Sequence, residues 1–319
     1  MMNGKIFQID ILRALCAIYI IGIWHLTNYL DPSVYSFGRA YPYMNYLTIS
    51  VLSTFTFCSG FLLSKYEFAS LKDVSSFYKR RLIRLYPLFL LSGVTMYIIG
   101  YADLKQVIDA LLGVSLFTAS PIKTLWFISM CFFLYAITPL VRIGVKWKFN
   151  VLCILVLLTA ISFLCFKDIV DFRLLMYVPI YVIGLNLRNF KLHINKSQIL
   201  VITLISISLL LISFLVIDKN ESIAKLIGSI CGCAFIVSLA FLCPPQKKMS
   251  FLSQIVSWFA YSSLIAYLFH RQFFAISLYL LGQIYMSLPI ALMTLSVTFV
   301  MSWLMQKVYD RIISYRMAS

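Results

Sequence analysis

Long apolar runs recur along the whole chain, and they constrain its fold more than any other feature. A helix needs about 20 apolar residues to cross a hydrocarbon core of about 30 Å, and runs of this kind follow one another from the first dozen residues to the last. Of the 319 residues, 62% are hydrophobic and only 12% are charged, whereas soluble domains carry about 25% charged residues. The sequence therefore predicts an all-α membrane protein, a polytopic bundle without a soluble domain.

Ten transmembrane helices are expected when the runs are divided at charges, prolines and polar clusters. The expected spans are 10–30, 46–64, 82–100, 125–141, 150–166, 174–187, 199–217, 223–242, 256–280 and 285–306. The span 174–187 is short and contains Pro179 and Gly184, so we expect it to be bent or to cross only in part. The ten spans are taken as one domain that covers residues 1–319.

The charge balance indicates the orientation of the chain. There are 27 Lys and Arg residues against 11 Asp and Glu residues. If the N-terminus is cytoplasmic, 17 of the cations fall in inner segments and 7 in outer segments. The positive-inside rule explains this distribution, so the excess of positive charge does not point to nucleic acid. It predicts that both termini are cytoplasmic and that the number of spans is even.

The eight cysteines are scattered, mostly within apolar runs. They show no ligand spacing and no paired loop framework, so we interpret them as packing residues and expect no metal site. The outer loop 101–124 contains the segment LKQVIDALLGVSLF, whose apolar residues share one helical face. This segment is expected to form an amphipathic helix that lies either in the membrane interface or packed on the bundle.

Ionisable residues inside the first span need an explanation, because each costs several kcal/mol in a bilayer unless it is paired or faces a wet cavity. Asp10 and Arg13 are three residues apart and are able to pair along one helix face. His25 comes fifteen residues after Asp10, so it lies about 22 Å from Asp10 along the helix, in the outer half of the membrane. It either donates to a backbone carbonyl as helix glue or serves as a buried, neutral imidazole that acts as a base.

A second group of charges lies in FYKRRLIRLYP, residues 77–87. Arg80, Arg81 and Arg84 are spaced to line one side of a helix that is expected to be interrupted near Pro87. Arginine forks match phosphate oxygens, so a phosphate-bearing ligand on the cytoplasmic face is one interpretation. The other is anionic lipid headgroups together with positive-inside orientation.

The ninth span carries His270 and Arg271 in its middle. Adjacent residues diverge by about 100° around a helix, so the two side chains are not expected to face the same partner. One of them must turn towards a cavity or a neighbouring helix.

Five stretches resemble acyltransferase family 3, integral-membrane enzymes that O-acylate surface polysaccharides and related glycans. The stretches are IDILRALCAIYIIGIWH in the first span, TFCSGFLLS in the second, KRRLIRLYP at the start of the third, TLWFISMCFFLYAITP in the fourth and SSLIAYLFH in the ninth. The resemblance runs from about residue 7 to residue 306. It rests on the order of these stretches together with the ten spans.

The resemblance implies an acyltransferase that uses cytoplasmic acyl-CoA, most often acetyl-CoA, and a sugar hydroxyl as acceptor. It implies catalytic roles for Arg13 and His25, and donor binding by the Arg-x-x-Arg of Arg81 and Arg84, to which we add Arg80. His270 is a second catalytic candidate. The implied partners are acyl-CoA, a glycan and membrane lipid, and the implied location is the bacterial cytoplasmic membrane.

The spacing between Arg13 and His25 departs from the family pattern. The family usually has ten residues between this arginine and histidine, whereas this chain has eleven. The additional residue moves the pair from about 20° apart on a regular helix to about 120° apart. A local bulge would restore the alignment. Without a bulge, Arg13 would support donor binding and His25 would act independently of it.

The mechanism expected on this basis has His25 taking the proton of an acceptor hydroxyl that attacks the acyl carbon. An acyl-histidine relay is an alternative. Thr54, Ser59 and Trp126 are candidates for stabilising the oxyanion. Two other functions stay open from the residues alone: a transporter or flippase of a lipid-linked glycan, whose path the buried charges would line, and a sensor or structural subunit in which they serve as helix glue.

Overall fold

Apolar sequence and helical structure coincide along the chain. The computed structural model of the protein describes residues 7–33, 41–117, 122–143, 147–187, 195–216, 221–243 and 251–318. This part of the chain is 84% helical and contains no β-strand. Its elements are α1 (Phe7–Tyr19), η1 (Ile20–His25), η2 (Leu26–Tyr29), α2 (Tyr41–Leu63), α3 (Leu71–Ile98), α4 (Leu104–Leu111), α5 (Trp126–Val141), α6 (Trp147–Phe166), α7 (Arg173–Leu187), α8 (Lys196–Val216), α9 (Ser222–Leu242), α10 (Phe251–Leu281) and α11 (Leu288–Ala318).

Each of the ten expected spans coincides with a helix, and α4 is an additional short one. Within the described ranges, eight helical segments are long and apolar enough to cross a membrane. The two shorter apolar helices are α5 and α7, of 16 and 15 residues. The protein is therefore an all-helical integral membrane protein. Eight of the cations used to predict its orientation lie outside the described residues: Lys5, Arg39, Lys146, Arg188, Lys191, Lys219, Lys247 and Lys248.

The helices form two compact units. Unit 1 comprises Met1–Phe55 and Ile194–Ser319, and unit 2 comprises Thr56–His193. The boundary falls inside α2, whose first part belongs to unit 1 and whose last part belongs to unit 2. The two ends of the chain thus share one unit, and the third to sixth expected spans form the other.

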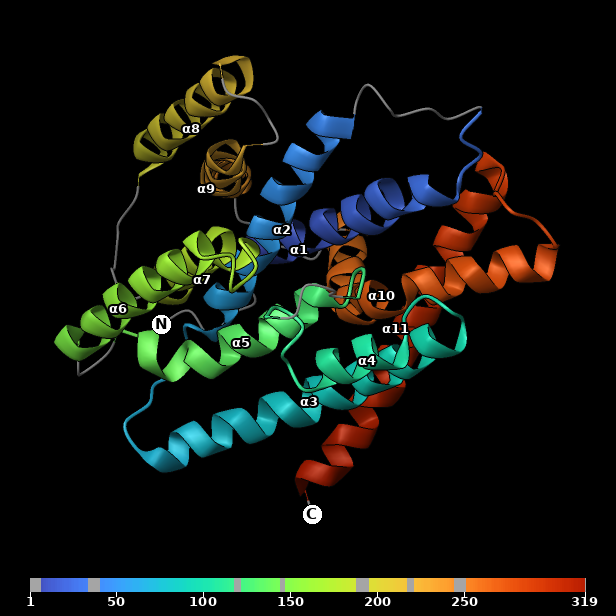
Figure 1. The fold of residues 1–319 in the computed structure, drawn as a ribbon, viewed down its shortest axis with the longest axis horizontal. Coiled ribbons are helices and arrows are strands. Elements are labelled where there is room, and N and C mark those ends of the chain that lie inside the picture. Colours follow the sequence, from blue (N-terminus) through green and yellow to red (C-terminus); the bar gives the residue numbers. More distant parts are fainter. Residues whose placement is uncertain are drawn as a thin grey trace. The chain divides into compact units, whose positions relative to one another are not determined.

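Unit 1 is built around α10, which packs against α1 and α11 (Figure 1). Arg13 of α1 contacts Ala260, and further along both helices His25 contacts His270. The first span and α10 therefore run in parallel. This pairing brings together two segments that are separated by most of the sequence.

The last helix returns along α10 in the opposite direction after the loop 282–287. Trp258 near the start of α10 packs against Trp303, and Phe274 further along shares a buried core cluster with Ala291. Since α1 is parallel to α10 and α11 is antiparallel to it, the start of α1 and the end of α11 lie at the same end of unit 1.

In unit 2, α2 and α7 approach each other at two glycines. A Cβ atom at Gly60 would collide with the carbonyl oxygen of Tyr181, and one at Gly184 would collide with the carbonyl oxygen of Phe57. Small residues let membrane helices approach closely without a polar contact. Gly60 belongs to the TFCSGFLLS stretch of the second span, so this part of the sequence has a packing role.

The arginine-bearing helix of unit 2 corrects one prediction. The sequence predicts an interruption near Pro87, but α3 continues through Pro87 from Leu71 to Ile98. A proline removes one N–H donor, and a membrane helix tolerates the loss because neighbouring groups satisfy the freed carbonyl. The helix also begins eleven residues before the expected start at 82, with a capping box formed by Ser70 and Asp73.

The amphipathic segment of loop 101–124 forms the helix α4. It begins with a second capping box, formed by Asp103 and Gln106. Val107 and Ala110 are buried, and α4 packs on α3 and α5. One side of this helix is therefore packed on the bundle, as one of the two expectations had it. Ile108, which belongs to the predicted apolar face, is exposed.

Candidate active site

The first span departs from a regular α-helix just before His25. The α-helix ends at Tyr19, and Ile20–His25 form a π-helical turn. A π turn accommodates one additional residue, so His25 takes the angular position that a shorter spacing would give it, about 20° from Arg13 rather than about 120°. The bulge that would restore the alignment is present, and both Arg13 and His25 face α10.

The two intramembrane histidines form a hydrogen-bonded pair within unit 1. Nε2 of His270 lies 2.7 Å from Nδ1 of His25. The two rings are within 5° of parallel, with centroids 4.7 Å apart. His25 is 7% exposed and His270 is fully buried. The sequence predicts both residues as candidates, and the structure brings them into contact across a separation of 245 residues.

Backbone carbonyls determine the tautomers of this pair when both rings are neutral. Nδ1 of His270 lies 3.1 Å from the carbonyl oxygen of Ala266 and 2.9 Å from that of Tyr267. Carbonyl oxygens only accept, so Nδ1 of His270 carries the hydrogen and its Nε2 is an acceptor. Nδ1 of His25 must then donate to His270. Nε2 of His25 is left with a lone pair, which is the nitrogen that a general base needs.

Arg13 ties the first span to the helix that carries His270. Its Nη2 donates to the carbonyl oxygen of Ala260 at 2.7 Å and to Oγ of Ser263 at 3.1 Å. Nη1 lies 3.7 Å from a carboxylate oxygen of Asp10, the predicted pairing along α1. The guanidinium therefore fixes the register of α1 on α10, at a point that precedes the histidine pair along both helices.

Arg271 also faces the first span, although it is adjacent to His270. Its Nη1 donates to the hydroxyl of Tyr29 at 3.5 Å. Tyr29 lies four residues after His25, and its ring packs on Phe274 with centroids 5.0 Å apart. The sequence predicts that His270 and Arg271 have different partners. The structure gives them different partner residues, and both partners belong to the first span.

In unit 2, Arg81 lies among three aromatic rings. Its guanidinium carbon is 5.3 Å from the ring centroid of Tyr66, 5.6 Å from that of Phe77 and 5.9 Å from that of Tyr135. Nη2 donates to the Tyr66 hydroxyl at 2.8 Å. Cation–π contacts and one hydrogen bond therefore hold Arg81 in a defined position.

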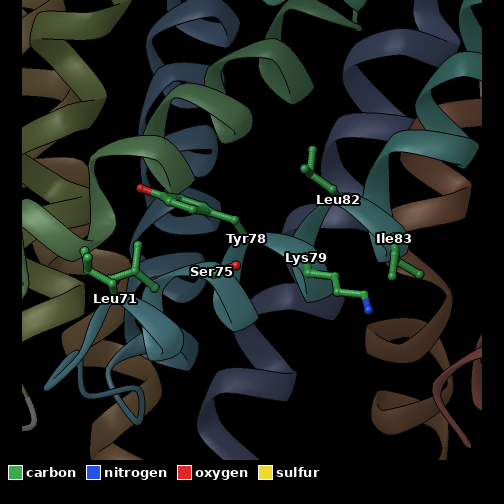
Figure 2. Close-up of a pocket in the computed structure, with 7 residues that line it drawn as sticks. Leu71, Ser75, Tyr78, Lys79, Leu82 and Ile83 are labelled. Carbon is green, nitrogen blue, oxygen red and sulfur yellow. The ribbon is translucent and has the colours of Figure 1, made fainter.

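The other cations of this stretch are exposed, and Arg80 and Lys79 have different neighbours. Arg80 lies 5.6 Å from the ring centroid of Tyr66, whereas Arg84 is exposed one turn later. Lys79 lines a separate hollow of about 670 Å³ on α3, together with Leu71 and Tyr78 (Figure 2). Arg80 and Arg81 thus share a partner that Lys79 does not.

The Tyr66 hydroxyl responds to these charges. Burial alone would raise its pKa, but Arg81, Lys65 and Arg80, together with the hydrogen bond from Arg81, outweigh burial and hold the pKa of Tyr66 below its usual value of 10.0. Tyr66 is outside the apolar spans and no sequence motif singled it out. Its position two residues after the TFCSGFLLS stretch was the available signal.

The three oxyanion candidates have intramolecular partners. Thr54 donates to the carbonyl oxygen of Ser50 in unit 1. In unit 2, Ser59 forms a hydrogen bond with Tyr135. The guanidinium carbon of Arg173 lies 4.2 Å from the ring centroid of Trp126. The described part of the chain contains no cluster of His, Cys, Asp or Glu that would hold a metal ion.

Comparison with known proteins adds the family. A family model described as an acyltransferase domain matches residues 6–307. The match includes the histidine pair and the α3 arginines. No curated protein and no solved structure matches the chain.

Proposed function

Since the chain belongs to the integral-membrane acyltransferase family 3, we propose that it transfers an acetyl group from cytoplasmic acetyl-CoA to a hydroxyl of a cell-surface or lipid-linked glycan. Residues 1–319 act as one catalytic domain in the bacterial cytoplasmic membrane, with both termini in the cytoplasm. That the protein is a membrane acyltransferase follows from the family. The donor, the acceptor and the residue roles are our proposal.

The observation that carries the proposal is the hydrogen bond between His25 and His270. A histidine that served only as helix glue would need no defined basic nitrogen. Here the carbonyl oxygens of Ala266 and Tyr267 fix the tautomer of His270, and the free lone pair of His25 is therefore on its Nε2. A buried imidazole whose free nitrogen is defined in this way suits proton transfer to and from a reacting hydroxyl.

In the proposed reaction, Nε2 of His25 takes the proton of the acceptor hydroxyl while the hydroxyl oxygen attacks the thioester carbonyl carbon. The carbon–sulfur bond then breaks, and the leaving thiolate of coenzyme A takes the proton back from His25. The products are the O-acetyl ester and free coenzyme A. His270 acts as a positioning residue, because it accepts from Nδ1 of His25 throughout.

The cations have separate roles in this proposal. The exposed Arg80 and Arg84 contact the phosphates of coenzyme A, since arginine forks bind phosphate oxygens bidentately. Arg81, which is held between aromatic rings, adds positive charge next to them. Arg13 acts on the histidine pair indirectly. Its hydrogen bonds to Ala260 and Ser263 hold α1 in register with α10.

The test uses membranes that contain the native glycan, supplied with acetyl-CoA that is radiolabelled in the acetyl group. Release of coenzyme A and label in glycan are measured for wild type, His25→Ala and Ile23→Ala. Ile23 is the matched control, because it lies in the same π turn and is 45% exposed. We expect His25→Ala to lose about 10²–10⁴-fold in rate, as removal of a general base does.

Two outcomes would contradict the proposal. If wild-type membranes release no coenzyme A and label no glycan, the acetyl-CoA reaction is not this protein's function. If His25→Ala is present at normal abundance and transfers label as well as Ile23→Ala does, His25 is not the base.

A further inference from the structure

Three cations in unit 2 gather around one tyrosine ring. Nζ of Lys65 lies 5.4 Å from the ring centroid of Tyr66, and the guanidinium carbons of Arg80 and Arg81 lie at 5.6 Å and 5.3 Å. Lys65 and Tyr66 come from the turn after α2, and the arginines come from α3. The cluster is therefore made by the fold, and the arginine spacing on α3 alone does not account for it.

The turn that carries Tyr66 is held rigidly by a buried arginine. Nε of Arg142 donates to the carbonyl oxygen of Tyr66 at 3.2 Å, and its Nη2 donates to that of Ser64 at 2.6 Å. Tyr66 also donates its own N–H to the carbonyl of Leu63 at 3.0 Å. A site built on a fixed backbone keeps its geometry when it is empty, which lowers the entropy cost of binding.

The cluster lacks a negative partner in the part of the chain that the structure describes. Neither Lys65 nor the two arginines form an ion pair with a described carboxylate. Nε of Arg81 is buried and has no hydrogen-bond partner among these residues. Like charges this close repel one another, and a bound anion would remove the repulsion.

We propose that Lys65, Tyr66, Arg80 and Arg81 form one anion-binding site for a phosphate group. Lys65 and Arg80, which are exposed, contact the phosphate oxygens directly. The Tyr66 hydroxyl accepts from Arg81 and directs its own hydrogen to the ligand. Arg81 anchors the hydroxyl from within. This inference rests on the proposed function for its first ligand, the phosphates of coenzyme A, and a lipid phosphate headgroup has the same chemistry.

The experiment measures binding and leaves catalysis out. Equilibrium binding of free coenzyme A and, separately, of a short-chain phosphatidylglycerol is determined for the purified full-length protein in neutral detergent. The variants are Tyr66→Phe and Lys65→Gln. The control is Lys72→Gln, which removes the same charge from an exposed position on α3. We expect about tenfold weaker binding of coenzyme A for each variant, the usual effect of losing a hydrogen bond to a charged group, and no change for the control.

Each outcome decides the proposal. Weaker binding of coenzyme A by both variants supports the site with coenzyme A as its ligand. Unchanged coenzyme A binding together with weaker phosphatidylglycerol binding by both variants supports the site with a lipid phosphate as its ligand. Variants that match wild type in both respects overturn it. If wild type itself binds no coenzyme A, the donor in the proposed function is wrong, and the phosphatidylglycerol comparison still tests the site.

Discussion

Replacing His270 tests whether its acceptor nitrogen, rather than its volume, matters to His25. His270→Gln keeps an acceptor oxygen for the N–H of His25, whereas His270→Leu keeps the bulk and removes the acceptor. We expect the Leu variant to lose at least about tenfold in kcat with little change in KM, and the Gln variant to recover part of the loss. Steady-state kinetics with acetyl-CoA measure both. Equal activities for the two variants would assign His270 to packing.

A second prediction at the residue scale concerns pH. The cations around Tyr66 outweigh its burial and lower its pKa in the folded protein. The resulting stabilisation is present above the unfolded pKa of about 10 and is lost as the pH falls through the folded value. As the pH rises towards 10, the phenolate forms earlier than in an ordinary tyrosine and neutralises Arg81.

Coenzyme A binding should therefore weaken at alkaline pH in wild type and change less in Tyr66→Phe. The groups facing the hydroxyl are Arg81, Lys65 and Arg80. The measurement is a binding titration from pH 7 to pH 10 for both proteins. Parallel profiles would mean that Tyr66 does not titrate in contact with the ligand.

At the scale of single elements, the π turn Ile20–His25 makes the length of the first span a testable quantity. Deleting Ile23, whose side chain is 45% exposed, removes one residue and should convert the turn to regular α-helix. Arg13 and His25 would still face α10. Inserting one alanine after Ile23 would require a second bulge, or would rotate His25 by about 100°.

Under the proposed function, we expect the deletion variant to keep most of its acyl transfer and the insertion variant to lose at least about tenfold, because only the insertion moves the proposed base, His25. Label transfer at matched membrane abundance measures the difference. The opposite ranking of the two variants would show that the π geometry itself, rather than alignment, is required.

The positions of the helices were predicted from the sequence more accurately than their ends. Apolar run length located ten apolar helices, because burial in lipid requires continuous apolar residues. Eight of the described helical segments are long enough to cross a membrane, and α5 and α7 are shorter. Run length placed the start of α3 eleven residues late, since charges mark the edge of the hydrocarbon and not the end of a helix. The interruption expected at Pro87 is absent for a related reason: the local rule for proline ignores the neighbouring groups that compensate in a membrane.

Contacts between distant segments limit what the sequence predicts about the site. His25, Arg13 and His270 stand out as costly ionisable residues, yet no spacing rule places His25 beside a residue 245 positions later. The same holds for Tyr66, whose contact with Arg81 arises only because the turn after α2 packs against α3. Residue type marked His25, Arg13 and His270 as candidates but not Tyr66, and tertiary packing determined the partners of all four.

For the whole molecule, the parallel pairing of α1 with α10 supports a prediction about topology. With cytoplasmic termini, loop 282–287 faces outward and the turn between α2 and α3 faces inward. A cysteine introduced at Gln283 should react with a membrane-impermeant maleimide on intact cells, and one introduced at Ala69 should react only after permeabilisation. Both positions are exposed, and wild type reports the background from native cysteines. The reverse pattern would invert the proposed orientation.

The distance in sequence between the paired histidines also determines when the pair is able to form during synthesis. At about 5–20 residues per second, translation needs about 12–50 s to cover the 245 residues from His25 to His270. Until then the first span has been inserted but its imidazole has no partner. Under the proposed function, nascent chains that stall before α10 are therefore expected to be inactive, because they have not yet acquired His270.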